Sequence, residues 1–493
     1  MLQKTDIDHW PGVVGFIKRT QLAMLPALSI QARYRLDNNN KRTDAMRKID
    51  VHGIIDDARF NGFHWLIMGL CALLLIFDGY DLFIYGVVLP VIMEEWGLTP
   101  LEAGALGSYA LFGMMFGALV FGTLADRIGR KKGITICFLL FSCATVLNGF
   151  ASTPTEFAIF RFLAGLGCGG LMPNVVALMN EYAPKKLRST LVAVMFSGYS
   201  LGGMFSAGLG IFLLPRFGWE VMFFAAVVPL LLLPVILLYL PESVGFLVRQ
   251  GRSEEARALL KRVQPEAELP ADAELQMLDT SGQKNSVLDL FRGGRLLGTL
   301  SIWVAFFCCL LMVYALGSWL PKLMANAGYS LGSSLSFLLA LNFGGMFGAI
   351  LGGWLGDRFH LGKVVVAFFA VSVISISLLG IKTPMPVLYT LITIAGATVI
   401  GTQILLYAAA AQFYGLSIRS TGLGWASGIG RNGAIVGPLL GGALLGINLP
   451  LQLNFIAFAI PGVIAALAMT LFVLSGKQQG TATAPAPLMA AKV

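Results

Sequence analysis

The sequence predicts an all-α membrane protein with twelve transmembrane helices in two parallel six-helix repeats. Three observations predict this fold class. The composition is 56% hydrophobic and only 12% charged, and soluble domains contain roughly twice that charged fraction, about 25%. Apolar runs recur along nearly the whole chain, and a run of about 20 apolar residues is long enough to cross a bilayer. The second half of the chain also repeats part of the first half.

The apolar runs form two sets of six predicted spans. The first set is expected at 64–89, 104–124, 133–150, 157–179, 190–213 and 219–240. The second set is expected at 296–320, 333–355, 364–381, 387–410, 421–445 and 451–474. The resulting units are an N-terminal bundle (64–240), a central loop (241–295), a C-terminal bundle (296–474) and a tail (475–493).

The residues before the first span (1–63) form a polar N-terminal segment. Residues 1–45 contain Asn-rich and basic stretches, without a membrane-length apolar run or the pattern of a signal peptide. Met46 begins MRKIDVHGIIDDARFNGFHW, a short amphipathic lead into the first span. Our hypothesis is that natural translation begins at Met46, so that residues 1–45 are not native; residues found upstream of Met46 by N-terminal sequencing would refute it.

The internal repeat is visible in the second span of each half. FGMMFGALVFGTLADR (112–127) aligns with FGGMFGAILGGWLGDR (343–358), with ten of sixteen positions identical. The same offset places Arg188 on Arg419. Six spans preserve the direction of the chain, so we expect parallel repeats with substrate between them near the midplane.

The formal charge of +9 is divided among alternate loops. The loop after the second span contains Arg127, Arg130, Lys131 and Lys132, whereas loop 90–103 contains three glutamates and no basic residue. Short basic loops stay in the cytoplasm, so both termini and the central loop are predicted to be cytoplasmic. Nucleic acid, the other partner that a basic chain suggests, is not expected because the basic residues form no single face.

Two aspartates, Asp78 and Asp81, lie inside the first predicted span. Asp78 lies about 20 Å along the helix from Trp65, near the midplane, and the i, i+3 spacing puts both carboxylates on one face. Each ion costs about 2.5–3.5 kcal/mol at this depth, and such residues usually line a transport path. Gly79 between them suggests an irregular backbone that faces a cavity. The alternative is a static ion pair that holds helices together.

Two basic residues, Arg161 and Arg431, also lie inside predicted spans. If all four groups were charged, the core would be neutral. One bound anion would unbalance it, and protonation of one aspartate would restore neutrality, which favours symport of an anion with a proton. The four histidines lie outside the span interiors, so an aspartate is the expected proton carrier.

The loop GTLADRIGRKKG (122–133) combines a small residue, an acid and a basic cluster. Gly122 would allow close approach of a neighbouring helix. Because part of this pattern recurs in the second half, we predict a gate-like latch in both halves; the alternative is that the basic cluster only sets orientation. The predicted latch residues are Gly122, Asp126, Arg127 and Arg130 with Gly353, Asp357 and Arg358.

The motifs of enzymes and metal sites are missing. All six cysteines fall inside predicted spans without metal-ligand spacing. The sequence contains no P-loop and no HExxH motif. We therefore expect no enzyme activity, no cofactor and no metal.

The chain resembles the major facilitator superfamily over about residues 60–475, on the basis of GTLADRIGRKK and of LPES (240–243) after the sixth span. DGYD (78–81), with IYGVVLP, SYALFG and PNVVALM, is similar to the aromatic acid:proton symporters, and the nearest likeness is to bacterial benzoate transporters. The resemblance implies import of a benzoate- or hydroxybenzoate-like acid with protons by alternating access, across a bacterial inner membrane, in aromatic hydrocarbon catabolism. We expect a monomer to be functional, although the sequence leaves the oligomeric state open. The resemblance assigns coupling to Asp78 and Asp81, the conformational switch to Gly122, Asp126 and Arg127, and importance to Arg161, Glu181, Arg419 and Arg431.

Recognition of an aromatic carboxylate needs a cation and apolar or aromatic walls. Arg431 is the preferred anchor and Arg161 the second. The candidate walls are Tyr85, Tyr109, Phe112, Tyr314 and Trp319, each of which could equally be a core or interfacial aromatic. Two other functions stay open: an exporter, antiporter or facilitator of such acids, and a membrane sensor. The fifth span, GYSLGGMFSAG (198–208), lacks the proline of the antiporter signature, and the central loop is small for an output domain.

Overall fold

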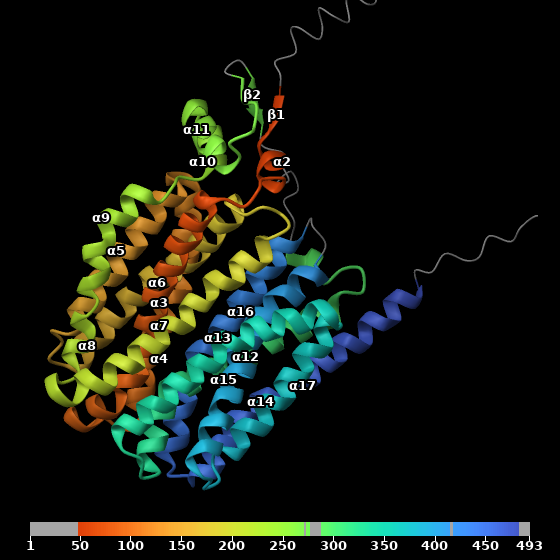
Figure 1. Cartoon of the computed structure of the whole chain (residues 1–493). Helices are drawn as coiled ribbons and strands as arrows, with labels where there is room; N and C mark the ends of the chain where they lie inside the picture. Colours follow the sequence, from red (N-terminus) through yellow and green to blue (C-terminus); the bar gives the residue numbers. More distant parts are fainter. Residues whose placement is uncertain (1–47, 271–272, 277–286, 415–417, 483–493) are drawn as a thin grey trace, which may run out of the picture.

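The computed structural model describes residues 48–270, 273–276, 287–414 and 418–482. It shows a bundle of long helices with a small cap of strands and short helices at one end (Figure 1). We call this the cap end of the bundle and the opposite one the distal end. The hypothesis about residues 1–45 concerns a segment outside the described residues, as do residues 483–493 of the predicted tail.

The helices of both halves follow the predicted spans. The N-terminal half contains α3 (Gly62–Glu95), α4 (Pro100–Ile128), α5 (Arg130–Asn148), α6 (Pro154–Tyr182), α7 (Arg188–Phe217), α8 (Glu220–Phe224) and α9 (Val227–Tyr239). The C-terminal half contains α12 (Leu296–Asn326), α13 (Leu331–Arg358), α14 (Leu361–Leu378), α15 (Met385–Phe413), α16 (Arg419–Gly446) and α17 (Leu451–Ala482). Span 219–240 is interrupted between α8 and α9 because Pro229 has no N–H to bond the carbonyl of Ala225.

Within the described residues, eleven segments are long and apolar enough to cross a membrane. α16 is not among them, because its sequence is rich in glycine and contains Arg431 and Asn432. It is nevertheless 28 residues long and packs against α12 and α4. The predicted span 421–445, the eleventh in order, therefore exists as a helix inside the bundle, but hydropathy alone does not identify it.

The two halves share one register. α4 begins at Pro100 and α13 at Leu331, while α6 begins at Pro154 and α15 at Met385, so both pairs have the same offset that aligns position 112 with position 343. The packing repeats as well: α4 contacts α6 as α13 contacts α15, and α3 contacts α7 as α12 contacts α16. The offset found in the second spans thus extends through each half, and any residue can be compared with its counterpart in the other half.

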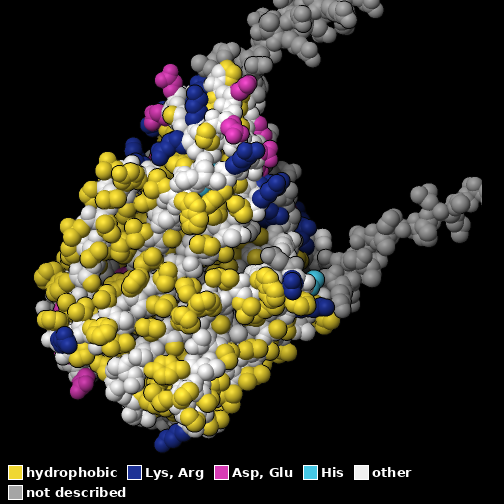
Figure 2. Space-filling model, in the orientation of Figure 1, with side chains coloured by type: hydrophobic (Ala, Val, Ile, Leu, Met, Phe, Trp, Pro, Cys, Tyr) yellow, Lys and Arg dark blue, Asp and Glu magenta, His cyan; other side chains and the backbone are white. Residues whose placement is uncertain are grey.

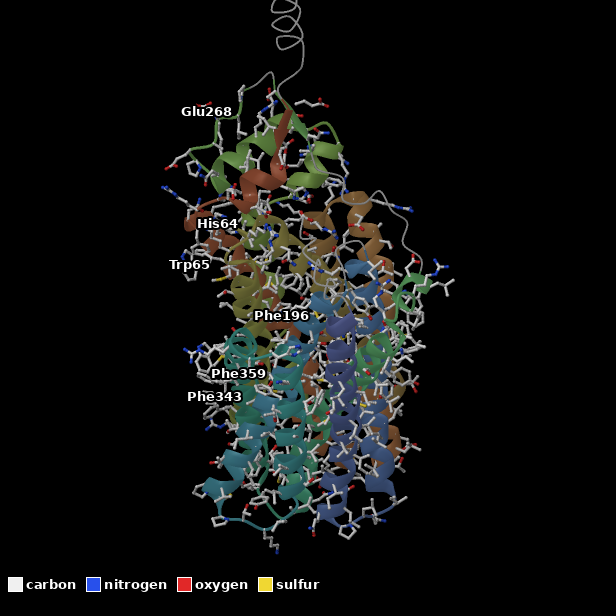
Figure 3. All side chains as sticks on the ribbon, turned by 90° about the vertical axis from the view of Figure 1, so that its right-hand side faces the viewer. His64, Trp65, Phe196, Glu268, Phe343 and Phe359 are labelled. Atoms are coloured by element: carbon white, nitrogen blue, oxygen red, sulfur yellow. The ribbon has the colours of Figure 1, made fainter. Side chains whose placement is uncertain are left out.

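The flank of the bundle is apolar. Hydrophobic side chains cover the face seen in Figure 2, and charged side chains gather around the cap. Exposed apolar residues on the helices include Phe116, Leu119, Phe212, Leu231 and Phe347, and Figure 3 shows Trp65, Phe343 and Phe359 at the edge of the bundle. A continuous apolar surface of this kind matches contact with lipid.

The cap joins the segment before α3 to the central loop. Its elements are β1 (Lys48–Asp50), α2 (Val51–Asp56), α10 (Val244–Arg249), α11 (Ser253–Val263) and β2 (Glu274–Gln276), followed by the short helix η1 (Val287–Leu290). β1 pairs in parallel with β2, with Ile49 opposite Leu275. The Asn61 amide donates to the carbonyls of Arg262 and Val263 at 3.1 and 2.9 Å. These contacts hold the start of α3 against the end of α11.

Close contacts between the halves lie toward the distal end. α3 packs on α12, α4 on α16 and α7 on α13. Glycines make the closest approaches: a Cβ on Gly86 would overlap the carbonyl oxygen of Gly317, and one on Gly442 would overlap that of Pro100. Near the cap end, a Cβ on Gly122 or Gly353 would meet no atom within 4 Å. In this conformation the halves are therefore packed tightly at the distal end.

The Gly86 contact gives a prediction about conformation. In Gly86→Ala the new methyl group overlaps the Gly317 backbone, so the halves should separate at the distal end. We expect longer distances between spin labels at the distal ends of α3 and α12, measured by double electron–electron resonance. Gly69→Ala is the control because nothing lies within 4 Å of its Cβ. Identical distance distributions in Gly86→Ala and Gly69→Ala would contradict the conclusion that the halves are packed tightly at the distal end.

Candidate functional site

Asp78 and Asp81 lie on the inner face of α3, with 0% and 1% of their surface exposed. The prediction of an irregular backbone at Gly79 is wrong, because α3 is continuous from Gly62 to Glu95. Gly79 instead permits close packing: a Cβ there would overlap the carbonyl oxygen of Tyr199 in α7. The two carboxylates are therefore held rigidly, one helical turn apart.

Asp81 is fully paired. Arg161 Nη1 of α6 lies 3.2 Å from Asp81 Oδ2 and also donates to the Asp81 carbonyl at 3.1 Å. Thr145 Oγ1 of α5 lies 2.6 Å from Asp81 Oδ1, and the Cys168 thiol is 3.9 Å from Oδ2. Both charged side chains are 1% exposed. Asp81 and Arg161 thus form a neutral, buried unit inside the N-terminal half.

Asp78 differs sharply from its neighbour. Neither of its carboxylate oxygens has a partner at hydrogen-bond distance in the described part of the chain. The groups that act on it electrostatically are the Cys168 thiol, which is a weak donor, and the charged side chains of Arg431 and Asp81. A buried polar group without a partner costs free energy. Asp78 is therefore the carboxylate that the protein leaves available.

Arg431 of α16 faces the N-terminal half across the interface. Its Nη1 lies 3.5 Å from Met114 Sδ of α4, and its Nη2 lies 3.6 Å from Met172 Sδ of α6. Thioethers are weak acceptors. Arg431 takes part in none of the ion pairs formed among the described residues. A guanidinium surrounded in this way has donors to offer a carboxylate ligand.

Tyrosines complete the surroundings of Arg431. The hydroxyls of Tyr199 (α7) and Tyr314 (α12) lie 3.2 Å apart and join the two halves, and Tyr407 Oη lies 2.9 Å from Ser427 Oγ. Arg431 interacts electrostatically with these three tyrosines and with Asp78. We call the following set the central cluster: Asp78, Met114, Met172, Tyr199, Tyr314, Tyr407 and Arg431.

Of the five predicted aromatic walls, the structure brings only Tyr314 to Arg431. The Tyr85 hydroxyl bonds the Ala103 carbonyl, and the Tyr85 ring lies 5.9 Å from the Arg161 guanidinium. Trp319 is buried and donates to the Pro438 carbonyl at 2.8 Å. Tyr109 and Phe112 are 44% and 41% exposed. These four side chains lie outside the central cluster.

Several residues of the cluster were missed in the sequence. Met114 and Met172 belong to apolar runs and look like ordinary core residues, so no local signal marks them. Tyr199 and Tyr407 could have been suspected, since each puts a hydroxyl inside a predicted span. Thr145 gives no signal alone, because a single threonine in a membrane helix commonly bonds its own backbone.

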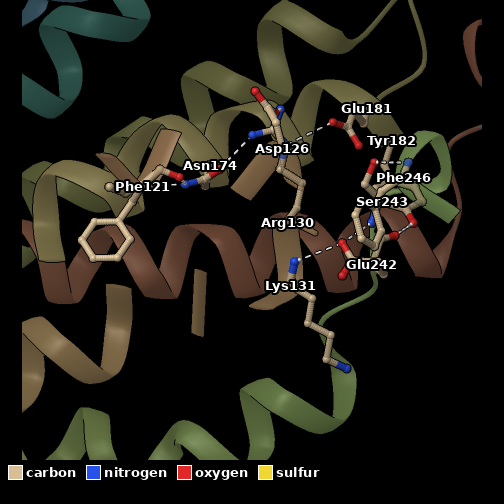
Figure 4. A network of polar contacts seen from close by, with 11 residues as sticks. Phe121, Asp126, Arg130, Lys131, Asn174, Glu181, Tyr182, Glu242, Ser243 and Phe246 are labelled. Carbon is tan, nitrogen blue, oxygen red and sulfur yellow. Dashed lines mark hydrogen bonds and ion pairs between the residues drawn. The ribbon is translucent and has the colours of Figure 1, made fainter. Parts of the chain in front are cut away.

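The first predicted latch is an ordered network at the cap end (Figure 4). Arg130 lies 2.7 Å from Asp126, 2.8 Å from Asn174 Oδ1 and 3.5 Å from Glu181. The Asn174 amide donates to the carbonyls of Phe121 and Gly170 at 3.3 and 2.8 Å. The network therefore ties the ends of α4, α5 and α6 together within the N-terminal half.

Glu242 links this region to the central loop. Its carboxylate accepts hydrogen bonds from the backbone N–H groups of Lys131 and Ser243 at 3.1 and 2.8 Å, and Tyr182 donates to its carbonyl. An acid at the start of α5 interacts favourably with the helix dipole. Gly129 has a φ of 101° there, and a Cβ would overlap the Glu242 carboxylate.

The remaining predicted gating residues are more dispersed. Arg127 and Gly353 are exposed, and the Arg358 guanidinium lies 4.6 Å from the ring centroid of Trp354 in its own helix. Arg419 Nε is 3.5 Å from the Tyr414 carbonyl, and the Asp357 side chain lies outside the described part of the chain. The second latch therefore does not reproduce the Arg130 network in its described side chains.

The Asp81–Arg161 pair gives a stability prediction. Asp81→Asn leaves the buried guanidinium without its counter-charge, so the free energy of unfolding should fall by about 3–5 kcal/mol. Chemical or thermal unfolding of purified protein measures this. The control is Glu255→Gln, since the Arg252–Glu255 pair is 46% and 58% exposed and such surface pairs contribute about 0–1 kcal/mol. Equal losses of unfolding free energy in Asp81→Asn and Glu255→Gln would show that the buried pair stabilises the fold no more than the exposed pair does.

The described residues contain no group of three or more His, Cys, Asp or Glu side chains that could hold a metal ion. The polar groups of the site are those of the central cluster and of the Asp81–Arg161 unit. A guanidinium can donate hydrogen bonds to an anion, and a carboxylate can take up a proton.

Comparisons with known proteins agree with this architecture. The Major Facilitator Superfamily model matches residues 71–430. The benzoate transport protein of Acinetobacter baylyi is 48% identical over 440 residues, 88% of this chain and 94% of that protein. The gentisate transporter of Corynebacterium glutamicum is 39% identical over 407 residues, 80% of this chain and 84% of that protein.

Two further matches extend the comparison. The 4-hydroxybenzoate transporter PcaK of A. baylyi is 36% identical over 429 residues, 85% of this chain and 93% of that protein. A solved structure of the E. coli xylose transporter XylE, partially occluded and inward open, has a TM-score of 0.65 at 17% identity and covers 84% of this chain and 98% of that one; it supports the fold alone. The chain is a transporter and not an enzyme, and it belongs to the major facilitator superfamily, in the group of aromatic acid transporters.

Proposed function

We propose that this protein imports a benzoate- or hydroxybenzoate-like carboxylate together with protons by alternating access. The observation that supports this most strongly is the contrast between the two aspartates. Asp81 is neutralised by Arg161, whereas Asp78 has no hydrogen-bond partner among the described residues and acts electrostatically on Arg431. The relatives named as benzoate, gentisate and 4-hydroxybenzoate transporters support the substrate class.

The charge balance of the cluster favours symport. With the Asp81–Arg161 unit neutral, Asp78 and Arg431 are the remaining opposite charges near the midplane. A substrate carboxylate that binds Arg431 compensates the guanidinium and leaves Asp78 with an uncompensated charge, which costs about 2.5–3.5 kcal/mol at this depth. Protonation of Asp78 removes that cost. Binding of the anion and of the proton therefore favour each other.

The ring of the substrate would pack among the aromatic and thioether groups. Tyr199 and Tyr314 offer ring faces and hydroxyls from opposite halves, and Phe83 packs edge-to-face on Tyr199 at 5.6 Å. Met114 and Met172 can move aside from Arg431, since methionine side chains adapt readily to irregular shapes. A ligand held from both halves at once favours their closure around it.

The orientation follows from the charges of the loops. Arg127, Arg130, Lys131, Lys185 and Arg249 lie at the cap end, and basic loops stay in the cytoplasm. We therefore assign the cap and both termini to the cytoplasm of a bacterial inner membrane, and the distal end to the outside. Tight distal packing then corresponds to a state closed to the outside, with Arg130 and its partners as the cytoplasmic latch. A single chain contains the whole cluster, so a monomer is proposed to function.

The test is reconstitution into liposomes with an imposed pH gradient, acidic outside, and a panel of labelled benzoates. We expect inward accumulation that collapses when a protonophore is added. Equilibration without accumulation would indicate a facilitator, and accumulation driven by the opposite gradient would indicate an exporter. Binding of the acids without any flux would favour a sensor. Each of these three outcomes overturns the proposal.

A further inference from the structure

One face of α5 is polar although it is buried in the N-terminal half. Ser142, Thr145 and Asn148 are each 0% exposed. Their i, i+3, i+6 spacing puts them in one row along the helix, which we call the α5 row. Thr145 touches Asp81 at 2.6 Å, so the row runs past the Asp81–Arg161 unit.

The repeat provides an internal control for this row. The offset between the halves places Val373, Ile376 and Leu379 of the C-terminal half at the positions of Ser142, Thr145 and Asn148. Buried serines do occur in α14, where Ser372 and Ser375 donate to carbonyls of their own helix at 2.8 and 3.1 Å, as Thr145 and Asn148 also do in α5. The difference is that Ser142 Oγ and Asn148 Oδ1 are buried without a partner among the described residues, whereas the hydroxyls of Ser372 and Ser375 are not. Packing of this fold therefore does not require a polar α5 row.

The buried charged residues differ between the two halves in the same way as the α5 row. The counterparts of Asp78, Asp81 and Arg161 in the C-terminal half are Cys309, Met312 and Ile392. The α5 row and the buried charges thus occur together in one half and are replaced together by less polar residues in the other. This association indicates that the α5 row acts together with the buried charged residues.

Several polar atoms along the row lack partners. Among the described residues, Ser142 Oγ, Asn148 Oδ1, Arg161 Nε and both carboxylate oxygens of Asp78 are buried without a hydrogen bond. Buried polar atoms in proteins are almost always satisfied, by ordered water where no protein group is near. A buried water typically makes about three hydrogen bonds to such groups. The atoms of this row and of the two acids are suitable partners for internal waters.

The Thr145 hydroxyl can form a hydrogen bond with Asp81 whether Asp81 is ionised or protonated. Its single hydroxyl hydrogen has two acceptors, Asp81 Oδ1 at 2.6 Å and the Phe141 carbonyl at 2.8 Å. A hydroxyl donates once and accepts as well. When Asp81 is ionised, Thr145 donates to it. When Asp81 is protonated, its O–H can donate to Thr145, whose hydrogen turns to Phe141.

The row also leads to the distal surface. Asn148 is the last residue of α5, and Phe150, two residues later, is 67% exposed. The distal contacts of Gly86 and Gly442 close the interface between the halves. The α5 row lies inside the N-terminal half, so it passes beside that closed interface and not through it.

We propose that Ser142, Thr145 and Asn148 hold a chain of internal waters that conducts protons from the distal side past the Asp81–Arg161 unit to Asp78, separate from the substrate path. The step is a simple transfer: a hydronium ion gives its proton to a carboxylate, which becomes a carboxylic acid, and a water molecule remains. This inference rests on the proposed proton coupling. It adds that proton and substrate enter by different routes.

The experiment compares two transport modes in proteoliposomes with labelled benzoate. Proton-driven accumulation needs the proton route, whereas exchange of labelled for unlabelled benzoate without a gradient needs only the substrate path. In Thr145→Val and in Asn148→Leu we expect accumulation to slow by about 100-fold or more, the range of a lost proton-transfer group, and exchange to persist. Thr145→Ser keeps the hydroxyl and should restore accumulation.

The matched control is Thr135→Val. Thr135 is on the same helix, and its hydroxyl donates to the Lys131 carbonyl at 2.7 Å, away from Asp81. This variant should accumulate benzoate like the wild type. Unchanged accumulation in Thr145→Val and Asn148→Leu overturns the inference. So does a parallel loss of accumulation and exchange that Thr145→Ser fails to reverse, since that is the behaviour of a structural residue.

A second measurement needs no variant. Synchrotron radiolysis of the wild-type protein labels buried residues that lie beside bound water, and we expect labelling of Phe141 and Cys168 next to the row. Absence of label there overturns the inference even if a variant fails to fold. Wild-type accumulation separates the two proposals: if the wild type exchanges benzoate but does not accumulate it with protons, the proposed function itself fails.

Discussion

Asp78→Asn is expected to abolish proton-driven accumulation while leaving a folded protein that still exchanges benzoate. The amide cannot take up or release a proton, so binding of the anion is no longer linked to a proton. Because neither oxygen of Asp78 has a hydrogen-bond partner among the described residues, the isosteric change removes no contact of the fold. The loss should be at least about 100-fold in the accumulation rate, as for removal of an essential proton-transfer group.

The measurement is uptake of labelled benzoate with and without an inside-alkaline gradient. In the wild type the gradient should increase uptake, and in Asp78→Asn it should have no effect. Glu102→Gln is the control, because Glu102 bonds Thr99 at the exposed start of α4. Full gradient-driven accumulation by Asp78→Asn would eliminate this residue as the proton carrier.

The second large effect is expected at Arg431. Arg431→Lys keeps the positive charge but loses the planar pair of donors that matches a carboxylate. Arg431→Lys should therefore bind benzoate more weakly. Arg431→Gln removes the charge as well, and removing one partner of a buried charge pair costs about 2–5 kcal/mol, which corresponds to affinity weakened by about 30-fold or more. Met114 and Met172 contact the guanidinium only through weak acceptors, so the fold should persist.

Equilibrium binding of benzoate to purified protein in detergent measures this effect directly. Arg249→Lys provides a matched control, since Arg249 is exposed in α10 of the cap, far from the cluster. Unchanged affinity in Arg431→Lys and Arg431→Gln would rule out Arg431 as the anchor. Weaker binding in Arg431→Lys with no further loss in Arg431→Gln would show that donor geometry outweighs charge.

The sequence predicts the bundle well because membrane helices are defined by long apolar runs. The offset between FGMMFG at 112 and FGGMFG at 343 also gives the register of whole helices, as the starts of α6 and α15 confirm. Hydropathy fails at α16, where glycines and Arg431 lower the average although the helix is there. The interruption of the sixth span depends on Pro229, a local feature that a hydropathy average hides.

The partnerships of the buried charges could not be predicted. Asp78 and Asp81 share a helix face, so their spacing does not show which of them meets Arg161. That choice depends on how α3 and α6 are placed by their neighbours: Gly79 packs α3 on the Tyr199 backbone of α7, and Gly165 packs α6 on the Ala110 backbone of α4. Pairing of β1 with β2 likewise joins the segment before the first span to the central loop after the sixth. Contacts between segments so far apart along the chain leave no local pattern in the sequence.

The glycine contacts of Gly86, Gly104 and Gly442 at the distal end have a consequence for the speed of opening. They are van der Waals contacts between backbone atoms, and separating them breaks no ion pair. The Ser108 hydroxyl donates across the interface to the Ile435 carbonyl at 2.7 Å. The Gly104 carbonyl of its own helix, at 3.1 Å, is an alternative acceptor. Among the described residues, opening the interface at Ser108 therefore need not leave its hydroxyl without an acceptor, and we expect this to keep the barrier to opening low.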